Sequence, residues 1–266
     1  MSGRGHLAII AVSDLHLGFD ASDKAAFTRF LGNLQSDPSV TDLVLLGDIV
    51  DMWRRDSSGI FLEIHDVLDL INEQKKKIRI YYVAGNHDFH VRKLQGLGYP
   101  INFNMDLKLQ QDGLNRRFVH GWEFDEMQRK HFMESLCHSM SDQKGERDTN
   151  IWAALGRYEN DLSRFFSIID WGRKRRIAEM LQLGPEQRLI ENLKGVERKA
   201  RSTVQPREVL VFGHTHGPFV NKAENLANTG SWVTGSPIHN TYVRIEGGKP
   251  RLFVFKGAEI TERADI

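Results

Sequence analysis

The chain has 266 residues, of which 40% are hydrophobic, enough for one large α/β domain. Its 36 basic and 35 acidic residues leave a formal net charge of +1, which argues against a protein built mainly to coat nucleic acid. The single cysteine, Cys137, excludes an intrachain disulfide and is typical of a reducing compartment, so we expect a cytoplasmic protein. No apolar run approaches the ~18–20 residues that cross a bilayer.

The first half of the chain alternates short apolar runs with amphipathic segments. Residues 7–12, 43–46 and 78–83 are rich in Ile, Val and Leu, as buried strands are. Two segments between these runs repeat apolar residues at helical spacing, which predicts a helix after each of the first two strands. This alternation favours a mostly parallel sheet with helices on its faces. The helical residues are Phe27, Phe30, Leu31 and Leu34 in the first segment and Ile60, Ile64, Leu68 and Ile71 in the second.

The pattern changes beyond Met105. Residues 107–110 and 116–120 flank a turn at Asp112-Gly113, which predicts a hairpin. Residues 122–205 have no strand-like run, so we expect a helical insertion there, broken at Gly184-Pro185. We interpret residues 1–266 as a single domain with a two-sheet core and this insertion. The helices are expected around 127–140, 151–171 and 176–201, and further strands at 209–212, 225–232, 241–246 and 252–255.

Polar residues follow five of the expected strands at the point where each strand ends. Ligands of open α/β sheets bind at the carboxyl ends of the strands, so these side chains are expected to converge. One such motif alone is more often a solvated loop or a satisfied buried pair, but five of them together indicate a metal site. The motifs are Ser13-Asp14-Leu15-His16, Gly47-Asp48-Ile49-Val50-Asp51, Gly85-Asn86-His87-Asp88, His120-Gly121 and Gly213-His214-Thr215-His216.

The donor types predict the kind of ion. A mixture of carboxylate, imidazole and amide donors favours Mn, Fe, Zn or a similar ion. The seven candidate ligands are too many for one tetrahedral ion and fit two ions that share a carboxylate, with open positions for water and substrate. The candidate ligands are Asp14, His16, Asp48, Asn86, His120, His214 and His216. We therefore expect two divalent ions, with Mn²⁺ first and Fe, Zn or Mg as alternatives.

These motifs, in this order, resemble the full motif set of the calcineurin-like metallophosphoesterase family. The resemblance spans about residues 7–120 and 208–232, and it implies an αββα two-sheet sandwich with a helical insertion at about 122–205. It also implies a role for each residue. Asp14, His16 and His216 would hold the first ion, Asn86, His120 and His214 the second, and Asp48 would bridge them. His87 would donate a proton to the leaving oxygen, Asp88 would orient the His87 ring, and Asp51 would tether neighbouring ligands by hydrogen bonds.

Within that family the sequence is most similar to the branch that contains UDP-2,3-diacylglucosamine hydrolases, which cleave a nucleotide–lipid pyrophosphate. The similarity rests on residues 13–18, 85–89 and 213–216. That branch usually has Arg where this chain has His87. Residues 165–181, an aromatic and aliphatic stripe that contains Arg173-Lys174-Arg175-Arg176, resemble its acyl-chain lid. The same stripe is also typical of a core face with a solvated flank, in which case it would not touch substrate.

The first functional hypothesis is a hydrolase of phosphodiester or pyrophosphate bonds in a phosphate-containing small molecule or a lipid-linked substrate. The alternatives are a phosphomonoesterase or protein phosphatase, a nuclease, and a scaffold that has lost its chemistry. Nucleic acid is not an expected partner at this net charge. A scaffold is disfavoured because every ligand position is filled. A lid of this composition would also bring the chain to an anionic membrane surface, as a peripheral contact.

Overall fold

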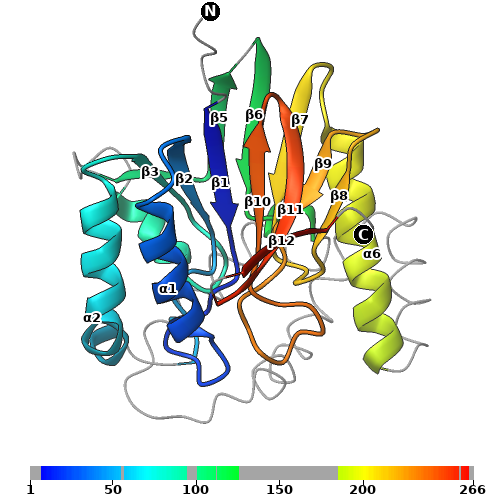
Figure 1. The fold of residues 1–266 in the computed structure, drawn as a ribbon. Helices are drawn as coiled ribbons and strands as arrows, with labels where there is room; N and C mark the ends of the chain where they lie inside the picture. The colour runs from blue at the N-terminus through cyan, green and yellow to red at the C-terminus, as the bar shows by residue number, and fades with distance from the viewer. Residues whose placement is uncertain are drawn as a thin grey trace, which may run out of the picture.

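The computed structural model describes residues 7–54, 57–94, 101–111, 113–125, 185–257 and 259–263. Within these ranges, two β-sheets lie face to face, with helices on the outside of each (Figure 1). The first sheet consists of Ala8–Val12 (β1), Val40–Leu46 (β2), Arg79–Val83 (β3), Asn102–Asn104 (β4), Thr241–Glu246 (β10), Lys249–Lys256 (β11) and Glu259–Arg263 (β12). The second consists of Asp106–Gln111 (β5), Leu114–Val119 (β6), Glu208–Phe212 (β7), Phe219–Asn221 (β8) and Leu226–Asn228 (β9).

The strand orders are β12-β11-β10-β1-β2-β3-β4 in the first sheet and β5-β6-β7-β9-β8 in the second. Strands β1 to β4 are parallel, and β10 joins them antiparallel to β1. Strands β6, β7 and β9 are also parallel to one another. The helices are Lys24–Leu34 (α1), Ser57–Gln74 (α2) and Pro185–Thr203 (α6), with short 3-10 turns at Phe89–Leu94 (η1) and Trp122–Phe124 (η2).

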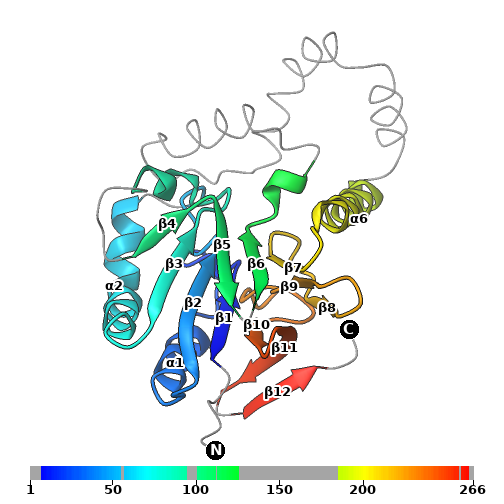
Figure 2. The same ribbon diagram turned by 90° about the horizontal axis from the view of Figure 1, so that it is seen from above.

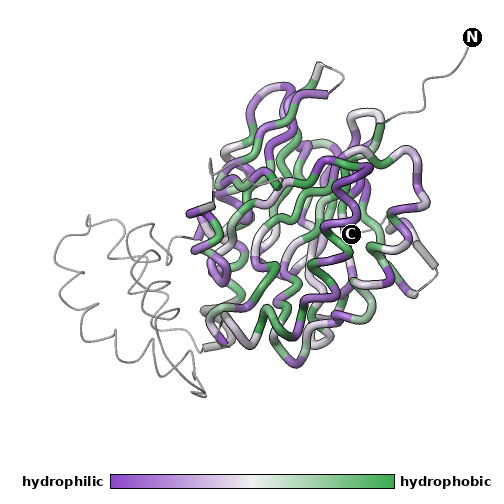
Figure 3. The backbone as a smooth tube through the Cα atoms, turned by 90° about the vertical axis from the view of Figure 1, so that its left-hand side faces the viewer, coloured by the Kyte–Doolittle hydropathy of each residue, from purple (hydrophilic) through white to green (hydrophobic). Residues whose placement is uncertain are grey.

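The layers run helix, sheet, sheet, helix, which is the αββα sandwich expected from the sequence. Seen from above, α1 and α2 lie beyond the first sheet, and α6 lies beside the second (Figure 2). Hydrophobic residues are concentrated along the strands in the middle of the molecule, and hydrophilic residues follow the outer turns (Figure 3). No helix among the described residues is long and apolar enough to cross a membrane.

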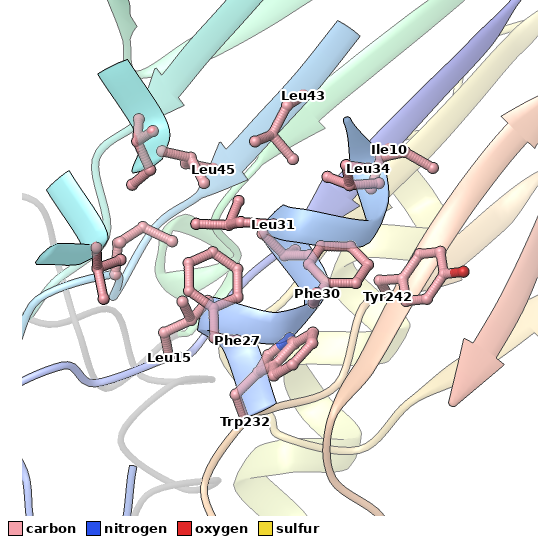
Figure 4. Close-up of a cluster of buried hydrophobic side chains, with 14 of the residues drawn as sticks. Ile10, Leu15, Phe27, Phe30, Leu31, Leu34, Leu43, Leu45, Trp232 and Tyr242 are labelled. Carbon is pink, nitrogen blue, oxygen red and sulfur yellow. The ribbon is translucent and has the colours of Figure 1, made fainter. Parts of the chain in front are cut away.

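Helix α1 contributes five buried residues to the core on the outer side of the first sheet. Asp23 begins it by accepting a hydrogen bond from the backbone N of Ala26, which satisfies a free N–H at the helix start. Phe27 and Phe30 both pack against Trp232, at ring-centroid distances of 5.3 and 5.1 Å (Figure 4). Trp232 lies close to the predicted metal motifs, because its backbone N donates to the carbonyl of Asp14. This aromatic cluster therefore anchors the loops that follow β1 and β9.

The two sheets share an apolar layer, in which Ile9, Val44 and Val243 of the first sheet meet Phe118 and Val211 of the second. A third cluster lies between the second sheet and α6. There Val196 and Ala200 of the helix pack with Leu210 and Phe212.

Helix α6 changes the prediction for the insertion. Its first residue is Pro185, which fits the break predicted at Gly184-Pro185, because proline is tolerated at the start of a helix. Residues 185–203 lie inside the stretch predicted as an insertion, yet they supply the fourth layer of the sandwich. The stretch 126–184, with the predicted lid at residues 165–181 and Arg173–Arg176, lies outside the described residues. The single-domain organisation therefore stays a prediction.

Two further predictions need correction. The buried face of α2 contains Ile60, Ile64, Val67 and Ile71, whereas Leu68 is 36% exposed, because the helical period places Val67 above Ile64. The strand predicted at 225–232 ends at Asn228, because Gly230 has a φ of +76° and turns the chain toward β1. The short strands β4, β8 and β12 were not predicted from the sequence.

Candidate metal centre

The polar motifs after β1, β2, β3, β6 and β7 meet at one edge of the sandwich. Three groups of side chains each place one ligand atom per residue within 4.8 Å of the others. The groups overlap, since Asp14 and His16 each belong to two of them. They are Asp14, His16 and His216; Asp14, Asp48 and His120; and His16, Asp51 and His87.

Asp14 and Asp48 lie at the centre of this arrangement. Asp14 Oδ1 is 3.3 Å from His216 Nε2 and 3.9 Å from His120 Nε2. Asp48 Oδ2 is 3.2 Å from His120 Nε2 and 3.8 Å from His16 Nε2. Both carboxylates are almost fully buried. Asp14 thus faces the imidazoles of His216, His120 and, at 4.0 Å, His16, and Asp48 lies between His16 and His120.

The backbone of the motifs is held in an unusual conformation. Five predicted ligands have positive φ: Asp14 (52°), His16 (50°), Asp48 (52°), His214 (69°) and His216 (55°). For a residue with a Cβ this region costs about 1–2 kcal/mol. Such strain gathers at functional sites, where the surrounding structure imposes it. Here it aims side chains from the three loops after β1, β2 and β7 at the same place.

Two of the motif glycines make room for this crowding. Gly47 has a φ of +80°, and a Cβ there would collide with the His120 ring. A Cβ on Gly213 would collide with the side chains of Ser13 and Asp14. A side chain at either position would therefore clash with residues of the candidate site.

The cluster concentrates negative charge. Burial opposes ionisation of Asp14, but His120 and His216 outweigh it and lower the pKa of Asp14 to about 2. The same balance lowers the pKa of Asp48, with His120 and His87 as its partners. Burial disfavours a charge on His120, yet Asp48 and Asp14 raise its pKa to about 10. At neutral pH a proton on His120 therefore offsets part of the carboxylate charge, a task that a metal ion could also perform.

The residues fit a metal ion in two further ways. Asp14 Oδ1 and His120 Nε2 are buried and form no hydrogen bond within the described part of the chain. In addition, His120 Nδ1 is 2.8 Å from the Leu46 carbonyl, and His16 Nδ1 is 3.0 Å from Asp51 Oδ2. Because both acceptors require a hydrogen on Nδ1, each neutral ring turns an Nε2 lone pair toward the cluster. Histidine ligands of metals are usually held in this way.

The structure corrects the role predicted for Asp88. His87 Nδ1 lies 3.0 Å from Asp51 Oδ1, so Asp51 orients this ring. Asp88 instead accepts hydrogen bonds from the backbone N of Ile49 and Gly85 and from the Tyr82 hydroxyl. Burial, followed by the nearby Asp48, raises the pKa of Asp88 to about 6. Asp88 therefore links the loops after β2 and β3 by hydrogen bonds to both.

His87 is enclosed by aromatic rings. Trp53 stacks on it at 4.1 Å between centroids, and the His16 ring meets it edge-on at 4.6 Å. Burial disfavours a charge on His87, but Asp51 and Asp48 outweigh it and raise the pKa of its imidazole. The two aspartates thus favour the protonated form of a buried ring beside the predicted ligands.

The remaining predicted ligands, Asn86 and His214, lie beside these groups but outside them. Asn86 is buried directly before His87. The His214 ring is 5.4 Å from the His120 ring, and its Nε2 is 3.4 Å from Asp125 Oδ2.

Sequence reasoning missed three residues around the site. Arg54 forms an ion pair with Asp51 and lies over the Phe19 ring, Trp53 stacks on His87, and Asp125 meets His214. Arg54 and Trp53 could have been found from the sequence, because they follow closely after the motif that ends at Asp51. The sequence signal for Asp125 was that an acidic residue lies five positions beyond His120.

Comparisons with known proteins point to one family. A family model described as calcineurin-like phosphoesterase matches residues 7–218. A curated relative named UDP-2,3-diacylglucosamine hydrolase, from Shewanella piezotolerans, is 37% identical over 29% of this chain and 32% of its own length. One of the same name from Photorhabdus laumondii is 24% identical over 81% of this chain and 85% of its own length.

The chain thus spans about a third of the length of the first curated relatives, and the relative from Haemophilus influenzae also matches over 32% of its length. Among solved structures, Yfce, a phosphoesterase from E. coli, is 16% identical with a TM-score of 0.48, covering 97% of this chain and 99% of that one. Vacuolar protein sorting 29 from Cryptosporidium parvum is 10% identical with a TM-score of 0.47, covering 97% and 96%. These low scores identify no function.

Proposed function

The chain belongs to the calcineurin-like phosphoesterase family, and we propose that it is a metal-dependent hydrolase of phosphodiester or pyrophosphate bonds. The observation that carries the proposal is the convergence of Asp14, Asp48, His16, His120 and His216 at one edge of the sandwich. Carboxylate and imidazole donors in this mixture suit Mn²⁺, Fe²⁺ or Zn²⁺ better than Mg²⁺, which prefers oxygen.

Two ions would divide the donors between them. Asp14, His16 and His216 would hold one ion and Asn86, His120 and His214 the other, with Asp48 shared. Two bound divalent ions would supply an activated water and would neutralise charge on the phosphate oxygens. Mn²⁺ is the ion that we propose as the best activator. Exhaustive chelation is then expected to abolish activity, and Mn²⁺ to restore it more fully than Mg²⁺.

His87 is proposed to donate a proton to the leaving oxygen. Its Nδ1 is occupied by Asp51, so the proton it can give is on Nε2. Asp51 and Asp48 favour the protonated form, and Trp53 restricts rotation of the ring. An acid fixed in this way needs little reorganisation when the bond to the leaving group breaks.

The substrate that we propose is a nucleotide- or lipid-linked pyrophosphate, because the curated relatives are named UDP-2,3-diacylglucosamine hydrolases. A cytoplasmic location and a peripheral membrane contact through the insertion would suit such a substrate. The second candidate function is phosphomonoesterase activity. It is favoured by His87, since a buried imidazole whose protonated form is stabilised by Asp51 and Asp48 suits a poor alkoxide leaving group.

The test is hydrolysis by the Mn²⁺-loaded full chain of UDP-diacylglucosamine, a chromogenic diester, a chromogenic monoester, cyclic nucleotides and single-stranded DNA. The Asp48→Ala variant serves as the inactive control. We expect cleavage of the nucleotide–lipid pyrophosphate and of the diester, at rates well above those for the monoester. Faster cleavage of the monoester would select the second function. A metal-loaded chain that cleaves none of these compounds would contradict both.

A further inference from the structure

Asp125 is a buried acidic residue beside the candidate centre that no predicted role includes. It follows the turn η2 and is 5% exposed. Its Oδ2 lies 3.4 Å from His214 Nε2 and 3.0 Å from the side-chain amide N of Asn192. Asp125 thus connects an imidazole of the centre with helix α6, which comes from a distant part of the sequence.

The other imidazoles at the centre show what such a contact does. His16 and His120 each have one ring nitrogen hydrogen-bonded to an acceptor other than Asp14 and Asp48, namely Asp51 and the Leu46 carbonyl respectively. In both rings the bonded nitrogen is Nδ1, and Nε2 faces the aspartates. His214 has the opposite arrangement, because Asp125 takes its Nε2. A neutral imidazole has one N–H and one lone pair, so an acceptor at Nε2 leaves the lone pair on Nδ1.

The rest of His214 is already fixed. Its φ is +69°, and its backbone N donates to Asp14 Oδ2 at 2.9 Å. The ring itself meets His120 at an interplanar angle of 72°, a contact that restrains its tilt but does not choose a tautomer. Of the contacts described for the His214 side chain, the one with Asp125 can determine which ring nitrogen carries the hydrogen.

Asn192 in turn holds Asp125. Its amide N is a donor at every pH, so it keeps one lone pair of Oδ2 occupied and fixes the orientation of the carboxylate. Asn192 lies one turn before Val196, which packs with Ala200 against the second sheet. The donor therefore rests on a helix that forms part of the core.

We propose that Asp125 is a positioning residue that sets the His214 tautomer with its lone pair on Nδ1, ready to bind a metal ion, and that Asn192 anchors Asp125 for this purpose. This inference rests on the proposed function, in which His214 is a ligand of the second ion. Helix α6 would then contribute to metal binding indirectly, because Asn192 contacts Asp125 and Asp125 contacts His214.

The test is metal binding by the full-length chain, measured without turnover. Mn²⁺ stoichiometry and affinity are determined by calorimetry and elemental analysis for the parent chain and for Asp125→Ala, Asp125→Asn, Asn192→Ala and His214→Ala. Glu208→Gln is the matched control, because Glu208 is also 5% exposed and accepts a backbone hydrogen bond, from Gln205, at the start of β7. The melting temperature of each metal-free variant separates a binding defect from a folding defect.

Asp125→Ala is expected to weaken one of two ions by about 10–100-fold, as loss of a hydrogen-bond partner of a ligating histidine does, and to keep the other ion. Asp125→Asn keeps an acceptor oxygen for His214 Nε2 and should weaken the same ion by a smaller factor. Asn192→Ala should weaken the same ion by a smaller factor, and Glu208→Gln should leave both unchanged. Two ions bound at parental affinity in Asp125→Ala would overturn the inference. So would loss of both ions together with a fall in melting temperature. A parent chain that binds no pair of ions, or a His214→Ala variant that keeps both, would show instead that the proposed function has failed.

Discussion

Asp51 Oδ1 lies 3.0 Å from His87 Nδ1, both side chains are buried, and the Trp53 ring stacks on His87. Asp51 belongs to the loop after β2, whereas His87 belongs to the loop after β3. Their contact therefore depends on the parallel pairing of these strands, in which Leu46 is opposite Val83. Asp51 therefore orients the residue that would give a proton, and through its other oxygen it also contacts His16, a proposed metal ligand.

The first prediction follows for His87→Ala. The variant should bind metal normally, because His87 is not among the proposed ligands. Turnover of substrates with poor leaving groups should fall by roughly 10²–10⁴-fold, as loss of a general acid does. Substrates with an activated aryl leaving group should lose much less. Rates on both substrate types are compared with those of His65→Ala, an exposed histidine on α2. Equal losses on both types would remove His87 from the acid role.

The second prediction separates Asp51 from Asp88. Asp51→Asn should weaken metal binding by about 10–100-fold and also slow turnover, because the same carboxylate accepts from His16 and His87. Asp88→Asn should lower the free energy of unfolding by about 1–3 kcal/mol, because at least one of its three donors would lose its acceptor. Denaturant unfolding of the metal-free variants gives that free energy, and metal titration gives the affinity. A larger affinity loss in Asp88→Asn than in Asp51→Asn would return the orienting role to Asp88.

Much of the fold and of the site could be predicted because the signals are local. Strands β1, β2, β3 and β7 each contain a continuous apolar run, which is followed closely by a polar motif. Strands β4 and β12 were missed because they lie at the edges of the first sheet, where each pairs with one neighbour only. An edge strand needs no continuous apolar run, and most residues of these two strands are polar or charged. The partner of His87 was also missed. The adjacent Asp88 contacts the loops after β2 and β3 instead of the His87 ring. Asp51 reaches that ring because β2 and β3 pair in parallel, and the spacing of residues in the sequence does not reveal this pairing.

The third prediction concerns Asp48→Ala. Asp48 Oδ2 is near both His16 and His120, and its Oδ1 accepts from the backbone N of His87. Removing this carboxylate should deplete both ions, whereas His216→Ala should affect chiefly the ion that it shares with Asp14 and His16. Elemental analysis after dialysis against metal-free buffer measures the occupancy. Normal occupancy of one ion in Asp48→Ala would show that Asp48 is not shared.

The last prediction is that metal binding releases protons. In the metal-free protein, Asp48 and Asp14 raise the pKa of His120 from its ordinary 6.5 to about 10, despite its burial. His120 is therefore protonated at pH 7.5 and has no lone pair on Nε2 to offer. An ion that binds there displaces this proton, so we expect release of roughly one proton from His120. Calorimetry in buffers of different ionisation enthalpy measures the number, and His120→Gln should release fewer.

The sign of the pH dependence follows from the same shift. A group whose pKa is raised on folding stabilises the folded state below its unfolded pKa, and this contribution is lost as pH rises through the folded value. The metal-free protein should therefore lose stability between about pH 6.5 and 10 from this residue, and proton release on metal binding should decline over the upper part of that range. Melting temperatures of the chain and of His120→Gln across this interval provide the check. Proton release that stays constant up to pH 10 and is unchanged in His120→Gln would contradict the assignment.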